Sequence, residues 1–318
     1  TLPVVPARRR PLVVSSITLP PMQAWPELRW SDWSDTCQTL QLWTQVAGKI
    51  RMARTPPVNH WWHVPLYVTT RGLGTSPIPD GNRTFSIDFD FIDHRLRVTC
   101  SDGTELSFAL QPMSVATFHR KTMESLASLG IDVKIHTTPS EVESPIPFEK
   151  DEQHASYDGD AAQRFWIALV QADRVMNAFR SRFIGKSSPV HFFWGSFDLA
   201  VTRFSGRKAP LHPGNAMLPD TVTREAYSHE VSSAGFWPGG PSMEAMFYSY
   251  AYGAPDGFGD AKVRPDAAFF SKEMGEFILP YEAVRSSASP DGTLMEFLQS
   301  TYEAAAELGQ WDRKALER

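Results

Sequence analysis

Apolar side chains recur every three or four residues in four long segments of the chain, which is the spacing of one face of an amphipathic helix. Each segment ends at a glycine or at a proline pair, and both are helix stop signals. The pattern therefore predicts four helices, at about 31–54, 114–129, 161–183 and 291–308.

Between these helices, apolar and polar residues alternate with a period of two, as in half-buried strands. The clearest case is 85–91, where Phe and Ile alternate with Ser and Asp. Turn residues at 79–82 and 101–104 indicate hairpins and hence antiparallel pairing. Further strands are predicted at 96–100, 106–110, 131–135, 227–237, 245–252 and 277–281.

Two aromatic segments, 57–72 and 189–206, look alike. Each opens with Pro-Val, reaches a His followed by two large aromatic residues, and contains Thr-Arg 11 or 12 residues later. We interpret both as strands and as equivalent parts of a duplicated unit. Superposition of 31–135 on 161–308 is then predicted to place His60 over His191 and Arg71 near Arg203.

The order of elements predicts an α+β fold of two similar units, each an antiparallel sheet with helices packed on one face. We expect an extended or disordered N-terminal tail, a first unit, a connector rich in Pro, Ser and Glu, and a second unit. Their predicted bounds are 1–24, 25–136, 137–160 and 161–318.

Composition narrows the classes of function. The chain has 318 residues, 42% of them hydrophobic, and a net charge of −5, so it lacks the basic surface typical of nucleic-acid-binding proteins. No apolar run reaches the 18 to 20 residues of a membrane span. Two cysteines are too few for a disulfide framework and favour a reducing cytoplasm. The oligomeric state stays open.

Several segments together resemble a bacterial domain-of-unknown-function family, over about residues 25–315. They lie at 59–67, 154–158, 191–206, 227–230 and 279–282. The resemblance implies a compact bacterial family member and carries no activity, cofactor or catalytic residue.

Histidines are the leading candidates for chemistry. His60, His63, His191 and His229 lie in aromatic surroundings, with His154 beside such a segment. A neutral imidazole there can transfer protons or bind a divalent metal, whereas the alternative is a core histidine bonded to a carbonyl. We predict that His191 and at least one of His60, His63 and His229 reach a shared pocket, where they serve as catalytic groups or metal ligands.

Carboxylates near the histidines are candidate general bases or imidazole partners, namely Asp198, Glu230 and Asp158. On one regular strand Ser196 and Asp198 share a face that His191 does not, which disfavours a Ser-His-Asp triad. No Gly-x-Ser-x-Gly elbow occurs either.

Other charged residues have two interpretations. Asp88 and Asp90 are expected to face solvent from their strand rather than to form an acid/base pair. Arg71 and Arg203 either clamp an anionic ligand or form salt bridges at strand ends.

Aromatic side chains either form a large aromatic core, which we favour for most of them, or supply the walls of a ligand pocket. No phosphate-binding glycine loop follows a strand, so we expect no nucleotide cofactor. The predicted wall residues are Trp61, Trp62, Trp194, Trp237 and Tyr248.

These observations favour an enzyme that acts on a small organic molecule in a His-rich, aromatic-lined cleft between the two units, by acid/base or metal-assisted chemistry. The first alternative is a non-catalytic module that binds a small ligand in an aromatic pocket. The second is a structural partner protein.

Overall fold

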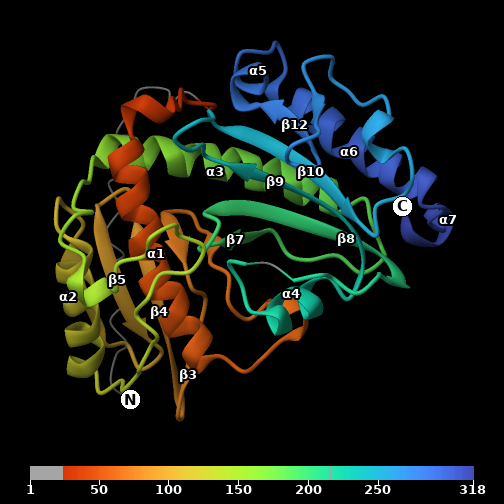
Figure 1. The fold of residues 1–318 in the computed structure, drawn as a ribbon. Helices are drawn as coiled ribbons and strands as arrows, with labels where there is room; N and C mark the ends of the chain where they lie inside the picture. Colours follow the sequence, from red (N-terminus) through yellow and green to blue (C-terminus); the bar gives the residue numbers. More distant parts are fainter. Residues whose placement is uncertain (1–23, 215) are drawn as a thin grey trace, which may run out of the picture.

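The computed structural model describes residues 24–214 and 216–318, which form seven α-helices and two antiparallel sheets of six strands each (Figure 1). The predicted α+β class is confirmed. The predicted tail over 1–24 lies, apart from Ala24, outside the described residues. The helices are α1 (Ser34–Arg54), α2 (Val115–Ser128), α3 (Gly159–Arg180), α4 (Asp220–Ala226), α5 (Tyr281–Arg285), α6 (Pro290–Leu308) and α7 (Arg313–Leu316).

The first sheet has the strand order β1-β2-β4-β5-β6, with β3 also paired to β4. Its strands are β1 (Tyr67–Val68), β2 (Gly72–Gly74), β3 (Ile78–Asp80), β4 (Arg83–Asp90), β5 (Arg95–Cys100) and β6 (Glu105–Ala109). No strand forms over 131–135, contrary to the prediction.

The second sheet has the order β11-β12-β10-β9-β8-β7. Its strands are β7 (His191–Phe193), β8 (Asp198–Lys208), β9 (His229–Trp237), β10 (Met246–Tyr252), β11 (Phe269–Ser271) and β12 (Glu276–Pro280). Short 3-10 turns complete the described chain: η1 (Trp30–Asp32), η2 (Asn59–Trp61), η3 (Phe148–Lys150) and η4 (Phe258–Asp260).

The four long helices begin and end where local chemistry dictates. The Ser114 hydroxyl accepts the Thr117 N–H at 3.1 Å and caps α2, and Pro290 occupies the first turn of α6. Helix α1 stops before Pro56 because proline disfavours helical geometry at the residue before it. The predicted helices therefore all form within a few residues of their expected bounds.

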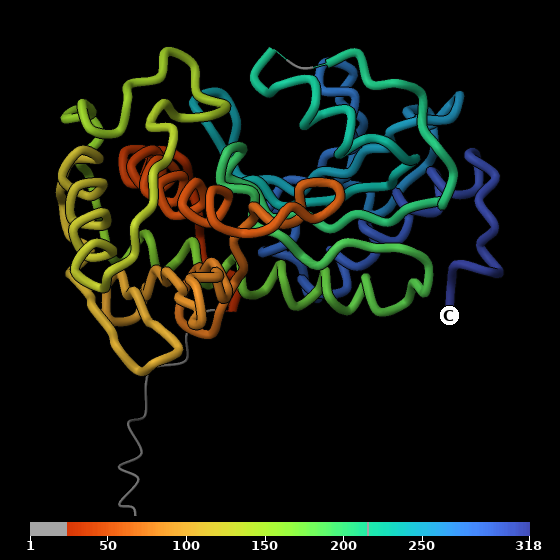
Figure 2. Tube along the Cα trace, turned by 90° about the horizontal axis from the view of Figure 1, so that it is seen from below, coloured from red at the N-terminus to blue at the C-terminus, as the bar shows by residue number. Residues whose placement is uncertain are grey.

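The second sheet has two different faces. Helices α3 and α6 pack on one face, while α1, η2 and α4 lie on the other (Figures 1 and 2). Because successive side chains of a strand point to opposite faces, Val201 and Arg203 of β8 face α3 and α6, and Ala200 and Thr202 face the other side. That other side holds the cavity described below.

The two halves of the chain share one hydrophobic core. Leu66 and Phe192 exchange two backbone hydrogen bonds of 2.9 Å, which join the edges of the two sheets. The predicted connector packs against this core, since Phe148 is fully buried and Tyr157 nearly so. The strand order does not confirm the internal duplication, which stays a prediction.

The two segments interpreted as equivalent strands differ in structure. Residues Asn59–Trp61 form a short, irregular 3-10 turn instead of a strand, and His60 and Trp61 in it have left-handed φ angles of 59° and 61°. The second segment is a hairpin, in which residues 194–197 reverse the chain between β7 and β8. The expected single strands, with His60 and His191 in matching positions, are therefore wrong.

Within the described ranges, no helix is long and apolar enough to cross a membrane.

Candidate functional site

A cavity of about 940 Å³ opens on the face of the second sheet that α3 and α6 leave free. Strands β8, β9, β10 and β12 form its floor, and α1, η2, α4 and the segment around residue 140 enclose it. Both predicted units contribute to the lining. All five predicted aromatic wall residues line this cavity: Trp61, Trp62, Trp194, Trp237 and Tyr248.

Asp198 is the buried carboxylate of this cavity, with 7% of its surface exposed. The Ser196 hydroxyl donates to one of its oxygens and the Tyr248 hydroxyl to the other. Glycine at 235 makes room for Tyr248, because a Cβ there would lie 2.3 Å from the Tyr248 hydroxyl. Burial raises the pKa of Asp198, although both hydrogen bonds favour its charged form.

Glu141 and Glu276 line the same cavity. Burial, and then the nearby Asp198 charge, raise the pKa of each to about 7. Among the described residues, neither glutamate side chain has a hydrogen-bonding partner. We call these three groups, Asp198, Glu141 and Glu276, the carboxyl cluster.

Helix α1 fixes the segment that carries Glu141. The Gln45 side chain donates to the Ser140 carbonyl at 2.9 Å and accepts the Ser140 N–H at 2.8 Å. The Lys49 ammonium, 3% exposed, donates to the Thr138 carbonyl at 2.9 Å and to the Ser140 hydroxyl at 3.2 Å. Lys49 and Ser140 line the cavity too, so the predicted connector is part of the site.

Left-handed backbone conformations gather around the cavity. His60, Trp61 and Glu141 line it with φ near +55° to +60°, and Phe197, between Ser196 and Asp198, has a φ of 59°. Such conformations are costly for residues other than glycine and cluster at functional sites. The segments that bring these side chains to the cavity are therefore held in place by the surrounding packing.

Tyrosines add neutral hydrogen-bond donors beside the carboxyl cluster. The hydroxyls of Tyr227 and Tyr250 lie 3.0 Å apart, and the rings of Tyr248 and Tyr250 stack with centroids 6.2 Å apart. Burial raises the pKa of all three phenols, so they stay protonated at neutral pH.

Of the predicted histidines, only His60 lines the cavity. Its Nδ1 lies 3.1 Å from the Glu225 carbonyl and 3.2 Å from the Ala226 carbonyl, and its Nε2 lies 2.6 Å from the Lys186 ammonium. Burial, and then the Lys186 charge, lower the pKa of His60. His60 is thus a neutral histidine that ties η2 to the end of α4.

The predicted convergence of histidines in one pocket is wrong. His191 is 1% exposed under the edges of Trp62 and Tyr67, and neither ring nitrogen has a partner among the described residues. Burial lowers its pKa to about 3. His63 accepts the Val58 N–H at 3.1 Å, so η2 turns it away from the cavity.

His229 also lies outside the cavity lining, with its Nδ1 3.0 Å from the Ser228 hydroxyl. Within residues 24–214 and 216–318, no group of three or more His, Cys, Asp or Glu side chains is arranged to hold a metal ion. The hypothesis of a metal held by His60, His63, His191 and His229 therefore finds no support in this geometry.

The triad argument needs a correction. The hairpin pairs His191 with Ala200 and Phe193 with Asp198, so His191 and Asp198 share a face of the sheet. Ser196 and Asp198 are bonded to each other, but His191 contacts neither through its nitrogens. No triad forms.

Two predicted carboxylate partners have structural roles. Glu230 accepts the Ser205 hydroxyl at 2.8 Å and Arg207 Nε at 2.9 Å, away from the cavity. Asp158 accepts the Ala161 N–H at 3.1 Å and caps α3. His154 is oriented by Asp151 instead, at 2.8 Å.

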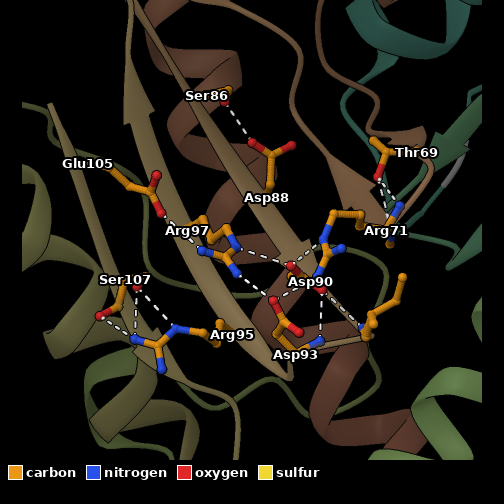
Figure 3. Close-up of polar contacts among 12 residues, drawn as sticks. Thr69, Arg71, Ser86, Asp88, Asp90, Asp93, Arg95, Arg97, Glu105 and Ser107 are labelled. Carbon is orange, nitrogen blue, oxygen red and sulfur yellow. Dashed lines mark hydrogen bonds and ion pairs between the residues drawn. The ribbon is translucent and has the colours of Figure 1, made fainter. Parts of the chain in front are cut away.

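The predicted arginine clamp does not form. The Arg203 guanidinium lies 3.4 Å from the Phe179 ring centroid and 4.3 Å from that of Tyr302, on the opposite face of the sheet. Arg71 forms an ion pair with Asp90 at 2.6 Å in the first sheet (Figure 3). The salt-bridge alternative thus holds for Arg71, and Arg203 is a core residue.

Asp90 is 1% exposed, so its predicted solvent-facing position is wrong. Burial alone would raise its pKa, but hydrogen bonds from Arg71, the Asp93 backbone and Arg97 lower it to about 2 (Figure 3). Asp88 is half-buried and accepts the Ser86 hydroxyl at 2.6 Å. Neither aspartate reaches the cavity.

Sequence reasoning missed Glu141, Glu276 and Lys49. Glu141 follows a Pro-Ser pair in the predicted connector, and Glu276 directly precedes a predicted strand. Neither position departs from an ordinary polar surface pattern. Only their burial around Asp198, which depends on the tertiary fold, distinguishes them.

No curated protein and no solved structure matches the chain. Residues 25–318 match the model of a family described as a family of unknown function, DUF5996. This match covers both sheets, the carboxyl cluster and the whole described cavity lining. The chain therefore belongs to the DUF5996 family.

Proposed function

We propose that the protein is an enzyme that binds a small, largely apolar organic molecule in the cavity and exchanges a proton with it through Glu141 or Glu276. The observation that carries this proposal is two carboxyl groups, each with a pKa raised to about 7, in an aromatic-lined cavity. A group with a pKa near the working pH both donates and accepts protons efficiently. Perturbed carboxyl groups in a concave site are typical of active sites.

The residues around Glu141 and Glu276 have two further roles, which are to set the protonation of the glutamates and to bind the ligand. Burial, and then the neighbouring Asp198, favour the protonated form of the two glutamates. Hydrogen bonds from Tyr248 and Ser196 hold the Asp198 carboxyl group in place. The aromatic walls bind the apolar body of the ligand, and the carboxyl cluster receives its polar group. A basic nitrogen or a carbonyl oxygen suits that position, because each accepts a proton from a neutral carboxyl group.

The second candidate is a non-catalytic binding protein for the same class of molecule. The predominance of apolar and aromatic side chains in the cavity lining favours it, since such walls retain a ligand without any chemistry. Both candidates are compatible with a cytoplasmic protein, which the free, buried thiols of Cys37 and Cys100 support.

Binding of 2-naphthylmethylamine, followed by quenching of tryptophan fluorescence, tests the site. We expect saturable binding to the wild-type protein and none to Ala200→Phe, which fills the cavity floor. Ala127→Phe, at an exposed position of α2, is the matched control and is expected to bind normally. Binding that survives in Ala200→Phe would show that the ligand site lies elsewhere.

Exchange of the α-hydrogens of 1-indanone in D2O, followed by NMR, separates the two candidates. Because the glutamates are the proposed proton carriers, we expect faster exchange with the wild-type protein than with the Glu141→Gln, Glu276→Gln double variant. Normal binding of 1-indanone with no acceleration by the wild-type protein would favour the non-catalytic candidate.

A further inference from the structure

Lys186, in the connection between α3 and β7, lies beside the cavity in an unusual environment. Its ammonium is 5.4 Å from the Trp62 ring centroid and 5.0 Å from that of Phe204, and both rings line the cavity. Among the described residues, no carboxylate lies within ion-pair distance of this ammonium. The amine therefore lies between two aromatic rings without a counter-ion.

A base of fixed tautomer faces this amine. His60 Nδ1 lies near two backbone carbonyls, which only accept hydrogen bonds, so the imidazole proton belongs on Nδ1. The lone pair of Nε2 is then free, and it lies 2.6 Å from Lys186 Nζ. This geometry suits the transfer of a proton from the ammonium to the imidazole.

The local electrostatics favour the neutral forms of both Lys186 and His60. Burial lowers the pKa of Lys186, which increases the fraction of free amine at a given pH. Among the described residues, His229 is a further titratable group near the pair, with its ring centroid 6.0 Å from that of His60. His60 and His229 are both basic, so neither stabilises the Lys186 ammonium by an opposite charge.

We propose that Lys186 is a nucleophilic amine that forms a Schiff base with an aldehyde or ketone at the edge of the cavity, with His60 Nε2 as its proton acceptor. The proposal does not depend on the carboxyl cluster. The aromatic rings of Trp62 and Phe204 beside the amine favour an aromatic or otherwise flat carbonyl compound.

The proposed step is balanced. The Lys186 ammonium transfers a proton to His60, and the free amine attacks the carbonyl carbon as the carbonyl π electrons move to oxygen. A proton shift from nitrogen to oxygen gives a neutral carbinolamine. The His60 imidazolium then protonates the hydroxyl, which leaves as water, and a protonated imine forms. His60 returns to its neutral state and one water is released.

Reductive trapping tests this inference. The protein is incubated with benzaldehyde and sodium cyanoborohydride at pH 7, and benzylated lysines are quantified by peptide mass spectrometry. Lys150, Lys186 and Lys208 are all exposed residues, so the neighbours of Lys186 make the difference. We expect Lys186 to react at least about tenfold faster than Lys150 and Lys208, because its amine lies next to the His60 base and between two aromatic rings. Labelling of Lys186 no faster than of those two lysines would overturn the proposal without any variant.

Variants test the role of His60. His60→Gln is expected to reduce the rate of Lys186 benzylation about tenfold, towards the rates of Lys150 and Lys208. His154→Gln, remote from the pair, should leave the rate unchanged, and Lys186→Arg should remove this label alone. The melting temperature of each variant reports folding.

A folded His60→Gln protein with an unchanged rate of Lys186 benzylation would show that His60 is not the base. If the wild-type protein did not bind 2-naphthylmethylamine but Lys186 were still labelled rapidly, the proposed function would be wrong and this inference would stand.

Discussion

Carboxyl groups in this protein behave in opposite ways according to their partners. Asp90 receives hydrogen bonds from two arginines and two backbone N–H groups, which lower its pKa to about 2 and stabilise its charge (Figure 3). Glu141 and Glu276 are half-buried and have no such partners, and burial followed by the Asp198 charge raises their pKa to about 7. The charged Asp90 therefore stabilises the folded state at neutral pH, whereas ionisation of Glu141 or Glu276 destabilises it.

Replacement of Glu141 by glutamine tests this difference through the pH dependence of stability. The pKa of Glu141 is about 7 in the folded protein, against 4.5 for an ordinary glutamate in the unfolded chain. The folded state therefore binds more protons than the unfolded state, and the free energy of unfolding of the wild-type protein falls as the pH rises from about 4.5 to 7. Glu141→Gln removes this loss. We expect it to raise the free energy of unfolding by roughly 2–3 kcal/mol at pH 8 and by little at pH 4.5.

Urea unfolding of the wild-type protein, Glu141→Gln and Glu276→Gln at the two pH values measures the effect. Glu124→Gln, on the exposed surface of α2, is the control and should change stability little at either pH. Glu141→Gln and Glu276→Gln proteins that are both less stable than the wild type at pH 8 would mean that these side chains are paired and charged in the fold.

Residue chemistry was only partly predictable from the sequence. The aromatic residues Trp61, Trp62 and Trp194, which the sequence assigns either to a core or to a pocket wall, line the cavity. The histidine roles were not predictable. His60 and Phe197 adopt left-handed φ angles, which redirect the following side chains, and a regular-strand pattern does not reveal them.

At the scale of elements, the periodic segments folded as expected apart from 131–135, and the irregular ones did not. The 3.6-residue and two-residue periods of the helices and strands report burial, which is a local property of the sequence. The segment over 137–158 has no such period, yet it packs closely on α1. Its position depends on Gln45 and Lys49, two polar residues that a helical pattern assigns to the surface.

Gln45→Ala tests how α1 positions Glu141. The substitution leaves the Ser140 N–H and carbonyl without partners, so we expect a loss of about 1–3 kcal/mol in the free energy of unfolding. Because the freed segment exposes Glu141 to water, the pKa of this carboxyl group should fall towards 4.5.

Gln163→Ala on α3 is the matched control, since Gln163 makes a single 3.4 Å bond to the Phe91 carbonyl far from the cluster. It should cost less stability and leave the titration of Glu141 unchanged. If Gln45→Ala lost stability but Glu141 still titrated near pH 7, other contacts would hold the segment in place.

At the scale of the whole molecule, the cavity exists only because the two halves share one core. Helix α1 and η2 from the first half cover the sheet of the second half, and the backbone bridge between Leu66 and Phe192 fixes the edge where they meet (Figure 2). Glu141 and Glu276 are more than a hundred residues apart in sequence. No sequence pattern within either half shows that both line one cavity with Asp198, which explains why the carboxyl cluster was not predicted.

The most direct test of the carboxyl cluster is a ¹³C NMR titration of protein labelled at the glutamate side-chain carboxyl carbons. We expect two glutamate resonances to titrate near pH 7, one of them absent from Glu141→Gln and the other from Glu276→Gln. A wild-type spectrum in which every glutamate titrates in the ordinary range near 4.5 would contradict the account.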